Sequence, residues 1–218
     1  MGSAILLSLQ VAIAVGFVLL AIGIPLGWLL ARTSFPGKLL LETAISLPLV
    51  LPPTVVGFWL LLLIGRGGPL VEWFGIELVF TRAAIVIAAS IMGMPLMVQA
   101  TRVAFASVDV RLENAARTLG CSEWKVFWRV SLPLARRTVL AGFLLGLLRA
   151  LGEFGASLMV AGNVPGKTQT MPLAIYDAVY RSDFFTANAL SLVLTLLALF
   201  GLWAARRLET SPTARIEG

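Results

Sequence analysis

Residues 109–133, DVRLENAARTLGCSEWKVFWRVSLP, form a polar and basic stretch between two long runs of apolar, almost uncharged sequence. We call this stretch the central segment. Its first part, from Leu112 to Gly120, is predicted to be a short helix that ends at Gly120, because glycine readily takes the left-handed conformation of a helix end. A short polar element between apolar runs is typical of a loop that joins two membrane-spanning helices.

The second part of the central segment is predicted to be another short helix. Ser122 fits the N-cap position, and the spacing of Trp124, Phe127 and Trp128 places three aromatic rings on one face. Pro133 is expected to close the segment before the next apolar run. An aromatic face on a basic loop indicates a contact surface.

Composition places the chain among membrane proteins. Of its 218 residues, 59% are hydrophobic and 13% are charged, which lies outside the range of soluble domains. The net charge of +6 does not indicate nucleic-acid binding, because the basic residues flank apolar runs instead of forming a patch. Histidine is absent and Cys121 is the single cysteine, so a metal site, a disulfide or nucleophilic catalysis is not expected.

The fold expected is an all-α integral membrane domain of residues 1–208, followed by a polar tail at 209–218. A membrane span needs roughly 20 apolar residues. The five stretches that qualify are residues 4–31, 39–64, 83–106, 135–160 and 187–205.

The positions of lysine and arginine predict the orientation. Arg32 and Lys38 lie in the first link with no acid between them, and the region 102–137 holds seven basic residues against three acids. Basic links face the cytoplasm, whereas the other two links are balanced in charge. We therefore expect the N-terminus outside, the C-terminus inside and the central segment in the cytoplasm.

Proline residues interrupt the second span. Pro48, Pro52 and Pro53 remove amide donors at membrane depth, so the helix should be broken or distorted there. One interpretation is irregular backbone that lines a solute pathway, and the other is a kink fixed only by packing.

Arg149 and Glu153 form the only opposite-charge pair well inside a predicted span. Four residues apart, they are expected on one helix face. They can be a fixed ion pair that sets helix packing, or they can line a solute pathway or gate in which Arg149 attracts an anion.

The central segment resembles the EAA loop of ABC importer permeases, whose pattern is E-A-A-x3-G-x9-I-x-L-P. The residues at the pattern positions are Asn114, Ala115, Ala116, Gly120, Val130, Leu132 and Pro133, with Val130 in place of the isoleucine. Asn114 replaces the glutamate of the pattern, and the adjacent Glu113 can supply the acid. The resemblance implies a cytoplasmic coupling helix that docks in a groove of an ATP-hydrolysing subunit, through Glu113, Asn114, Ala115, Ala116, Gly120, Trp124, Phe127 and Trp128. The alternative is an amphipathic connector that lies on lipid headgroups.

Three further motifs are similar to the molybdate branch of the molybdate and sulfate permeases: RALGEFGA at 149–156, AGN at 161–163 and TQTMPLAIY at 168–176. The first is shared with sulfate and thiosulfate permeases, which remain an alternative. The resemblance implies a homodimeric inner-membrane pore that moves molybdate or tungstate inward, with two ATPase subunits and an extracytoplasmic binding protein as partners. It implies no enzyme activity and no cofactor in this chain, since ATP and magnesium would be bound by the ATPase.

The last link contains polar groups that can donate hydrogen bonds to a passing oxyanion. They are Asn163, Thr168, Gln169 and Thr170. Hydroxyls in a turn-rich loop can equally cap their own backbone. An ion-driven secondary carrier and an intramembrane enzyme are competing classes; the first leaves the aromatic face unexplained, and the second lacks a nucleophile or metal cluster.

Overall fold

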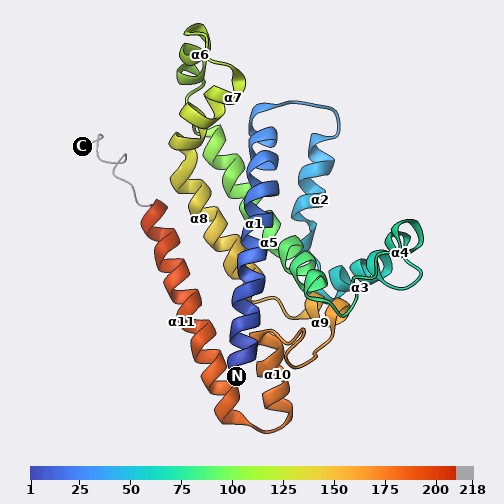
Figure 1. Ribbon diagram of the computed structural model, residues 1–218. Helices are drawn as coiled ribbons and strands as arrows, with labels where there is room; N and C mark the ends of the chain where they lie inside the picture. The colour runs from blue at the N-terminus through green and yellow to red at the C-terminus, as the bar shows by residue number, and fades with distance from the viewer. Residues whose placement is uncertain (210–218) are drawn as a thin grey trace.

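The computed structural model describes residues 1–209, and within that range every regular element is helical (Figure 1). The predicted tail at 209–218 lies, apart from its first residue, outside the described residues. The elements are α1 (Gly2–Arg32), α2 (Lys38–Val50), α3 (Pro53–Ile64), α4 (Pro69–Phe74), α5 (Arg82–Ala106), α6 (Val110–Thr118), α7 (Glu123–Val126), the π-helical turn η1 (Phe127–Ser131), α8 (Leu132–Leu151), α9 (Gly155–Ala161), α10 (Met171–Tyr180) and α11 (Phe184–Glu209).

Three long helices, α1, α5 and α8, pack together as the body of the molecule. Small residues allow the close approach: a Cβ atom on Gly93 of α5 would lie 2.5 Å from the Gly146 carbonyl oxygen of α8. Small side chains at helix contacts are the usual means of packing helices in membranes, where no hydrophobic force draws them together. Small residues of α8 therefore allow α5 to pack closely against it.

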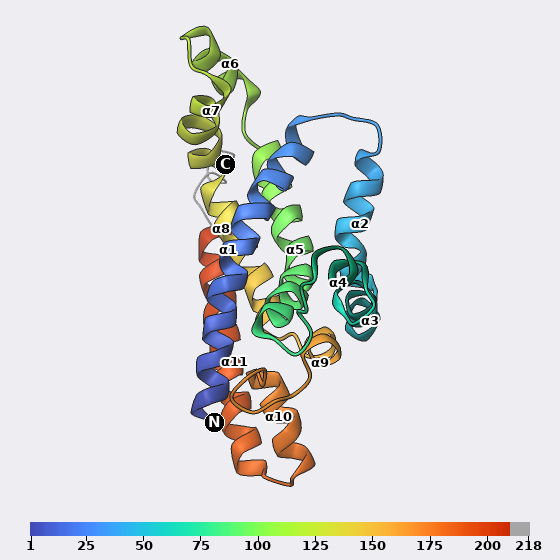
Figure 2. The same cartoon turned by 45° about the vertical axis from the view of Figure 1, so that its right-hand side comes forward.

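The two ends of the body carry different elements (Figures 1 and 2). The N-terminus and α10 lie at one end, and α6, α7 and the ends of α1 and α5 lie at the other. Arg32, Lys38 and the central segment thus share one end, as the charge count predicted.

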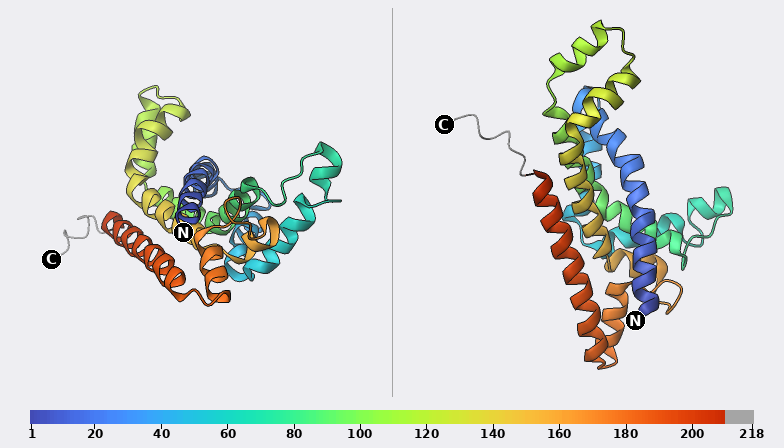
Figure 3. Two further views of the ribbon diagram at one scale, coloured as in Figure 1. Left: turned by 60° about the horizontal axis from the view of Figure 1, so that its bottom comes forward. Right: turned by 60° about the vertical axis from the view of Figure 1, so that its left-hand side comes forward.

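The second span is broken, as the prolines predicted. α2 ends at Val50 and α3 begins at Pro53, with Leu51 and Pro52 in extended conformation between them. With 13 residues, α2 is about 20 Å long and cannot cross the hydrocarbon core alone. α3 turns away from the line of α2 and, with α4, projects sideways from the body (Figure 3).

The prediction of one continuous fourth span over residues 135–160 is wrong. α8 ends at Leu151, residues 152–154 are not helical, and α9 is a separate short helix. The cause is local: the Glu153 carboxylate accepts a hydrogen bond of 2.8 Å from the Ala156 amide, so the chain starts a new helix after Glu153. The sequence stays largely apolar through the break, so the hydropathy pattern did not reveal where the helix ends.

Pro133 does not close the central segment. It lies in the first turn of α8, and the helix runs into it from α7 through η1. In η1 the Leu132 amide donates to the carbonyl of Phe127, five residues earlier, instead of four. Such a π-turn accommodates a proline that would otherwise clash with the preceding turn.

Five helical stretches of residues 1–209 are long and apolar enough to span a membrane: Gly2–Arg32, Pro53–Phe74, Arg82–Ala106, Glu123–Leu151 and Phe184–Leu208. The first, third and fifth begin and end within a few residues of the predicted spans. The sequence did not predict two short helices: α4, which ends the second of these stretches, and α10, which precedes the fifth.

Candidate functional site

The first helix of the central segment ends as predicted. Gly120 has φ of +81° and follows α6. Its amide donates to the Arg117 carbonyl at 2.9 Å, and the Cys121 amide donates to the Ala116 carbonyl at 3.1 Å. This pair of bonds is a Schellman motif, which reverses the chain direction and sets the angle between α6 and α7.

Glu113 is buried, with 2% of its surface exposed. Its carboxylate accepts hydrogen bonds of 2.7 Å from the Arg32 guanidinium and 2.7 Å from the Ser131 hydroxyl. Arg32 also donates to the Val108 carbonyl at 3.2 Å. The acid therefore joins α1, α6 and the start of α8, and it lies behind the surface of the central segment instead of on it.

A second ion pair holds α6 against α7 at the surface. Arg117 donates to both carboxylate oxygens of Glu123, at 2.7 and 3.0 Å, and to the Asn114 side-chain oxygen at 2.8 Å. The hydrogen bond from Arg117 lowers the pKa of Glu123, and the same bond raises the pKa of Arg117. Both groups stay charged at neutral pH, so this brace is present under physiological conditions.

The three aromatic rings of the central segment cluster as predicted. The Trp124 and Trp128 ring centroids lie 5.6 Å apart, and each ring also contacts Phe127. Phe127 is anchored, because its ring lies 5.8 Å from both Trp28 and Phe105. The indoles remain outside, with 70% of Trp124 and 51% of Trp128 exposed.

The exposed surface of the central segment thus combines aromatic and apolar side chains with polar and charged ones. Asn114 and Ala115 are exposed and Ala116 is half-buried. Leu112 and Leu119, which the sequence interpretation did not include, are 50% and 85% exposed. A protein rarely leaves side chains of this size in water unless a partner covers them.

The prolines of the second span have separate positions. Pro48 lies inside α2, Pro52 precedes α3 and Pro53 is its first residue. A Cβ atom on Gly155 would lie 3.1 Å from the Pro53 Cβ, so the start of α9 packs closely on the start of α3. The two broken spans meet at their breaks, and whether solute passes there stays a prediction.

Arg149 and Glu153 do form an ion pair, with 3.0 Å between guanidinium nitrogen and carboxylate oxygen. Glu153 is buried and lies beyond the last turn of α8, not on the helix face expected. Its second oxygen accepts the Ala156 amide. Both carboxylate oxygens therefore have protein partners, an arrangement that holds α8 to α9.

The polar groups of the last link turn inward. Thr168 is fully buried, and its hydroxyl accepts the Val164 amide at 3.1 Å. Thr170 is also buried, Asn163 is half-buried, and Gln169 donates to Asp177 at 3.5 Å. Thr168 thus supports the backbone of its own loop, whereas the buried oxygens of the Asn163 and Thr170 side chains have no hydrogen-bond partner.

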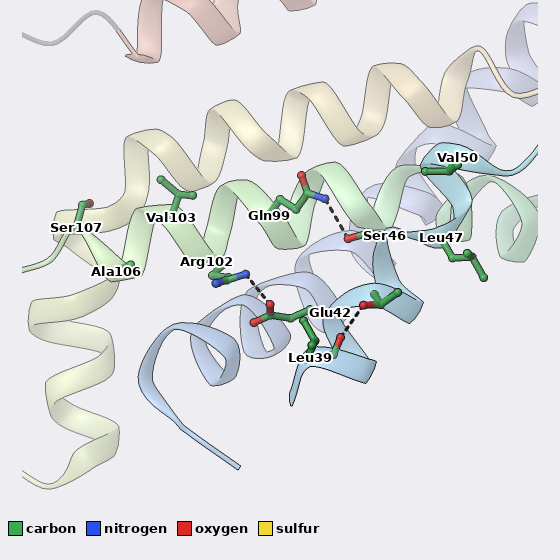
Figure 4. A pocket seen from close by; sticks show the side chains of 11 residues that line it. Leu39, Glu42, Ser46, Leu47, Val50, Gln99, Arg102, Val103, Ala106 and Ser107 are labelled. Atoms are coloured by element: carbon green, nitrogen blue, oxygen red, sulfur yellow. Dashed lines mark hydrogen bonds and ion pairs between the residues drawn. The ribbon is translucent and has the colours of Figure 1, made fainter. Parts of the chain in front are cut away.

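A cavity of about 960 Å³ between α2 and α5 carries polar side chains that the sequence interpretation missed (Figure 4). Arg102 and Glu42 form an ion pair of 2.9 Å across it, and the Gln99 amide donates to the Ser46 hydroxyl at 3.1 Å. The sequence did contain a pattern that indicates these groups. Polar residues at positions 42 and 46, and at 99 and 102, place one polar stripe on each of two apolar helices. Among residues 1–209, no group of three or more His, Cys, Asp or Glu side chains could hold a metal ion.

Comparison with known proteins identifies the family. Residues 23–212 match the family described as "Binding-protein-dependent transport system inner membrane component". The chain belongs to this family. Its similar relatives include the molybdenum transport system permease protein ModB of Escherichia coli K12, at 44% identity over 93% of both chains. The sulfate transport system permease protein CysW of Synechocystis is 35% identical over 86% of this chain and 69% of its own length.

Solved structures agree on the fold. A chain of the MetNI methionine ABC transporter in an inward-facing conformation matches with a TM-score of 0.69 at 17% identity, over 94% of this chain and 92% of that one. A chain of the bacterial alginate ABC transporter in complex with a pentasaccharide-bound periplasmic protein matches with a TM-score of 0.70 at 18% identity, over 96% of this chain and 79% of that one. The protein is a multi-pass permease of the inner membrane, and its central segment is the part with the EAA spacing.

Proposed function

We propose that the protein is the pore-forming subunit of an ATP-driven importer that moves molybdate, or tungstate, into the cytoplasm. The observation that carries the proposal is the full-length similarity to molybdenum permeases, at 42–44% identity in three different bacteria. Similarity to sulfate permeases is lower and covers less of the chain, so sulfate or thiosulfate is the second candidate. An ion-coupled carrier is disfavoured by membership of a binding-protein-dependent family.

In the proposed assembly, two copies of the chain form the pore, two ATPase subunits bind the central segments, and a binding protein delivers the oxyanion to the outer links. The chain itself performs no covalent chemistry. The exposed indoles of Trp124 and Trp128 are the side chains that would enter the ATPase. Because Glu113 ties the central segment to α1, and η1 continues into α8, a displacement of that segment is passed directly to membrane helices.

The test is reconstitution with the ATPase in lipid vesicles. Molybdate-loaded binding protein should raise ATP hydrolysis and anion uptake, whereas the sulfate-loaded form should not. Stimulation by the sulfate-loaded form alone would transfer the proposal to sulfate. Transport without the ATPase would reject the ABC mechanism.

Gly120→Val tests the docking claim within the same assay. At φ of +81°, a β-branched residue costs at least about 1–2 kcal/mol and opens the Schellman turn. We expect binding-protein stimulation of the ATPase and uptake to be lost together. Gly37→Val is the matched control, because Gly37 is also left-handed, with φ of +88°, but lies outside the central segment. Full stimulation in Gly120→Val would contradict docking through this turn.

A further inference from the structure

The cavity between α2 and α5 is open on one side and lined by both helices (Figure 4). Along its length lie two kinds of contact: the Arg102–Glu42 ion pair, and the hydrogen bond between Gln99 and Ser46. The wall between and around these groups is formed by apolar side chains, among them Leu47, Val50 and Val103.

The position of the polar groups favours water over lipid as the material that fills the cavity. Arg102 and Gln99 precede the cytoplasmic end of α5 at Ala106 by one and two helical turns, which is about 6 and about 10 Å. Ser46 lies at a similar distance inside α2. Charged and amide groups at this depth are costly against hydrocarbon and face the protein interior or water instead.

Charged groups of both signs meet at the cavity. Glu42 is the only acid among its lining residues, and it contacts two cations: Arg102 at 2.9 Å and Lys38, one turn earlier on α2, at 4.0 Å. The Glu42 oxygen that faces Lys38 has no hydrogen-bond partner. The Arg102 side chain is 45% exposed, so part of its guanidinium remains available to the cavity. The lining itself holds one cation and one carboxylate, and Lys38, which is not part of the lining, is a second cation beside that carboxylate.

We propose that this cavity is a binding station for a tetrahedral oxyanion on its way to the cytoplasm, in which the anion takes the place of Glu42 on Arg102. The proposal rests on the proposed function, which supplies the anion. Arg102 donates paired hydrogen bonds to the oxyanion, and the Gln99 amide and Ser46 hydroxyl donate to its other oxygens. Glu42, once released, has Lys38 within reach as its counter-ion.

The exchange explains why an acid lies in an anion pathway. A free arginine at this depth would hold a dianion tightly and slow its release. Glu42 competes for the same guanidinium, so the anion is bound only for a short time and leaves when the carboxylate returns. The site discriminates by charge and hydrogen bonding, not by close fit, because the cavity is much larger than one oxyanion.

The first experiment measures access and charge without requiring transport. Ser46→Cys is made in the reconstituted complex and treated from the cytoplasmic side with an anionic or a cationic methanethiosulfonate. The parent chain, whose only thiol is Cys121, gives the blank. We expect Ser46→Cys to react with both reagents, and several-fold faster with the anionic one. This preference for the anionic reagent should be lost when Arg102→Gln is added and kept when Arg102→Lys is added.

Leu199→Cys on α11 is the matched control. Leu199 is 58% exposed, and α11 contributes no residue to the lining of the cavity. It should remain unreactive. Millimolar molybdate should slow the anionic modification of Ser46→Cys relative to chloride at equal ionic strength. An unreactive Ser46→Cys would overturn the proposal and indicate a dry contact with lipid or with a second copy. Equal rates for the two reagents would also overturn it, because they would indicate a water-filled space without a positive field.

The second experiment measures transport. Arg102→Gln should lower molybdate uptake at least tenfold while binding-protein stimulation of the ATPase persists, and Glu42→Gln should slow uptake by delaying release. Arg66→Gln, which breaks an exposed pair of 3.8 Å with Glu77 on the other end of the molecule, is the control. Unchanged uptake in Arg102→Gln would reject the station. If the parent complex does not transport molybdate, the proposed function is rejected. The thiol experiment would still test the cavity, because it does not depend on transport.

Discussion

The central segment and the last link, residues 162–170, are both polar connections between apolar helices, yet they fold in opposite ways. The central segment buries one of its three acids, Glu113, and leaves Trp124 and Trp128 outside. The last link buries Thr168, and its exposed part is a backbone turn. In this turn the amides of residues 167–169 all donate to the Val164 carbonyl, at 2.9–3.1 Å. The first arrangement presents large side chains to a partner, whereas the second satisfies the loop itself. Exposure therefore separates a docking surface from a self-supporting turn where composition does not.

Removing the acid that anchors the central segment should have the largest effect. Glu113→Gln leaves the buried Arg32 guanidinium without its counter-ion, which costs about 3 kcal/mol. We expect a lower thermal midpoint in detergent and weaker coupling of ATP hydrolysis to uptake. Glu77→Gln is the control, because its pair with Arg66 is exposed and such pairs contribute little. Equal midpoints for the two variants would show that the buried pair does not anchor the segment.

Truncating the exposed indole should have the next largest effect, and on binding instead of stability. Trp124→Ala is expected to weaken ATPase binding by about 2 kcal/mol, roughly thirtyfold, as buried aromatic anchors do at interfaces. Affinity is measured by titrating the ATPase subunit onto the permease without binding protein. Trp73→Ala on α4 is the matched control, since Trp73 is 77% exposed but lies on the outward side. Loss of affinity in both variants would mean that the assay reports folding, not docking.

Much of the fold could be predicted because long apolar runs require helices. The spans that became α1, α5 and α11 have no internal break, and their ends coincide with charged residues such as Arg32 and Arg82. The break at Pro52 was also predictable, since proline removes an amide. The break at Glu153 was not, because it depends on a carboxylate that accepts the Ala156 amide inside an otherwise continuous apolar run.

The candidate site was predictable only in its local part. The turn at Gly120 and the aromatic cluster follow from spacing within a dozen residues. The burial of Glu113 depends on Arg32, 81 residues earlier in the chain, and the polar cavity depends on the pairing of α2 with α5. Contacts of this separation are decided by packing, which periodicity does not report.

Thr168 offers the smallest effect and a direct test of how the last link differs from the central segment. Thr168→Val removes the buried hydroxyl that accepts the Val164 amide, which costs about 1 kcal/mol and should lower the thermal midpoint slightly. Thr170→Val is the matched control: the Thr170 hydroxyl is buried without a hydrogen-bond partner, so its removal should be neutral or stabilising. Neither variant should change the KM for molybdate uptake. A raised KM in Thr168→Val with an unchanged midpoint would mean that the hydroxyl contacts solute, and the last link would then be part of the pathway and not only its support.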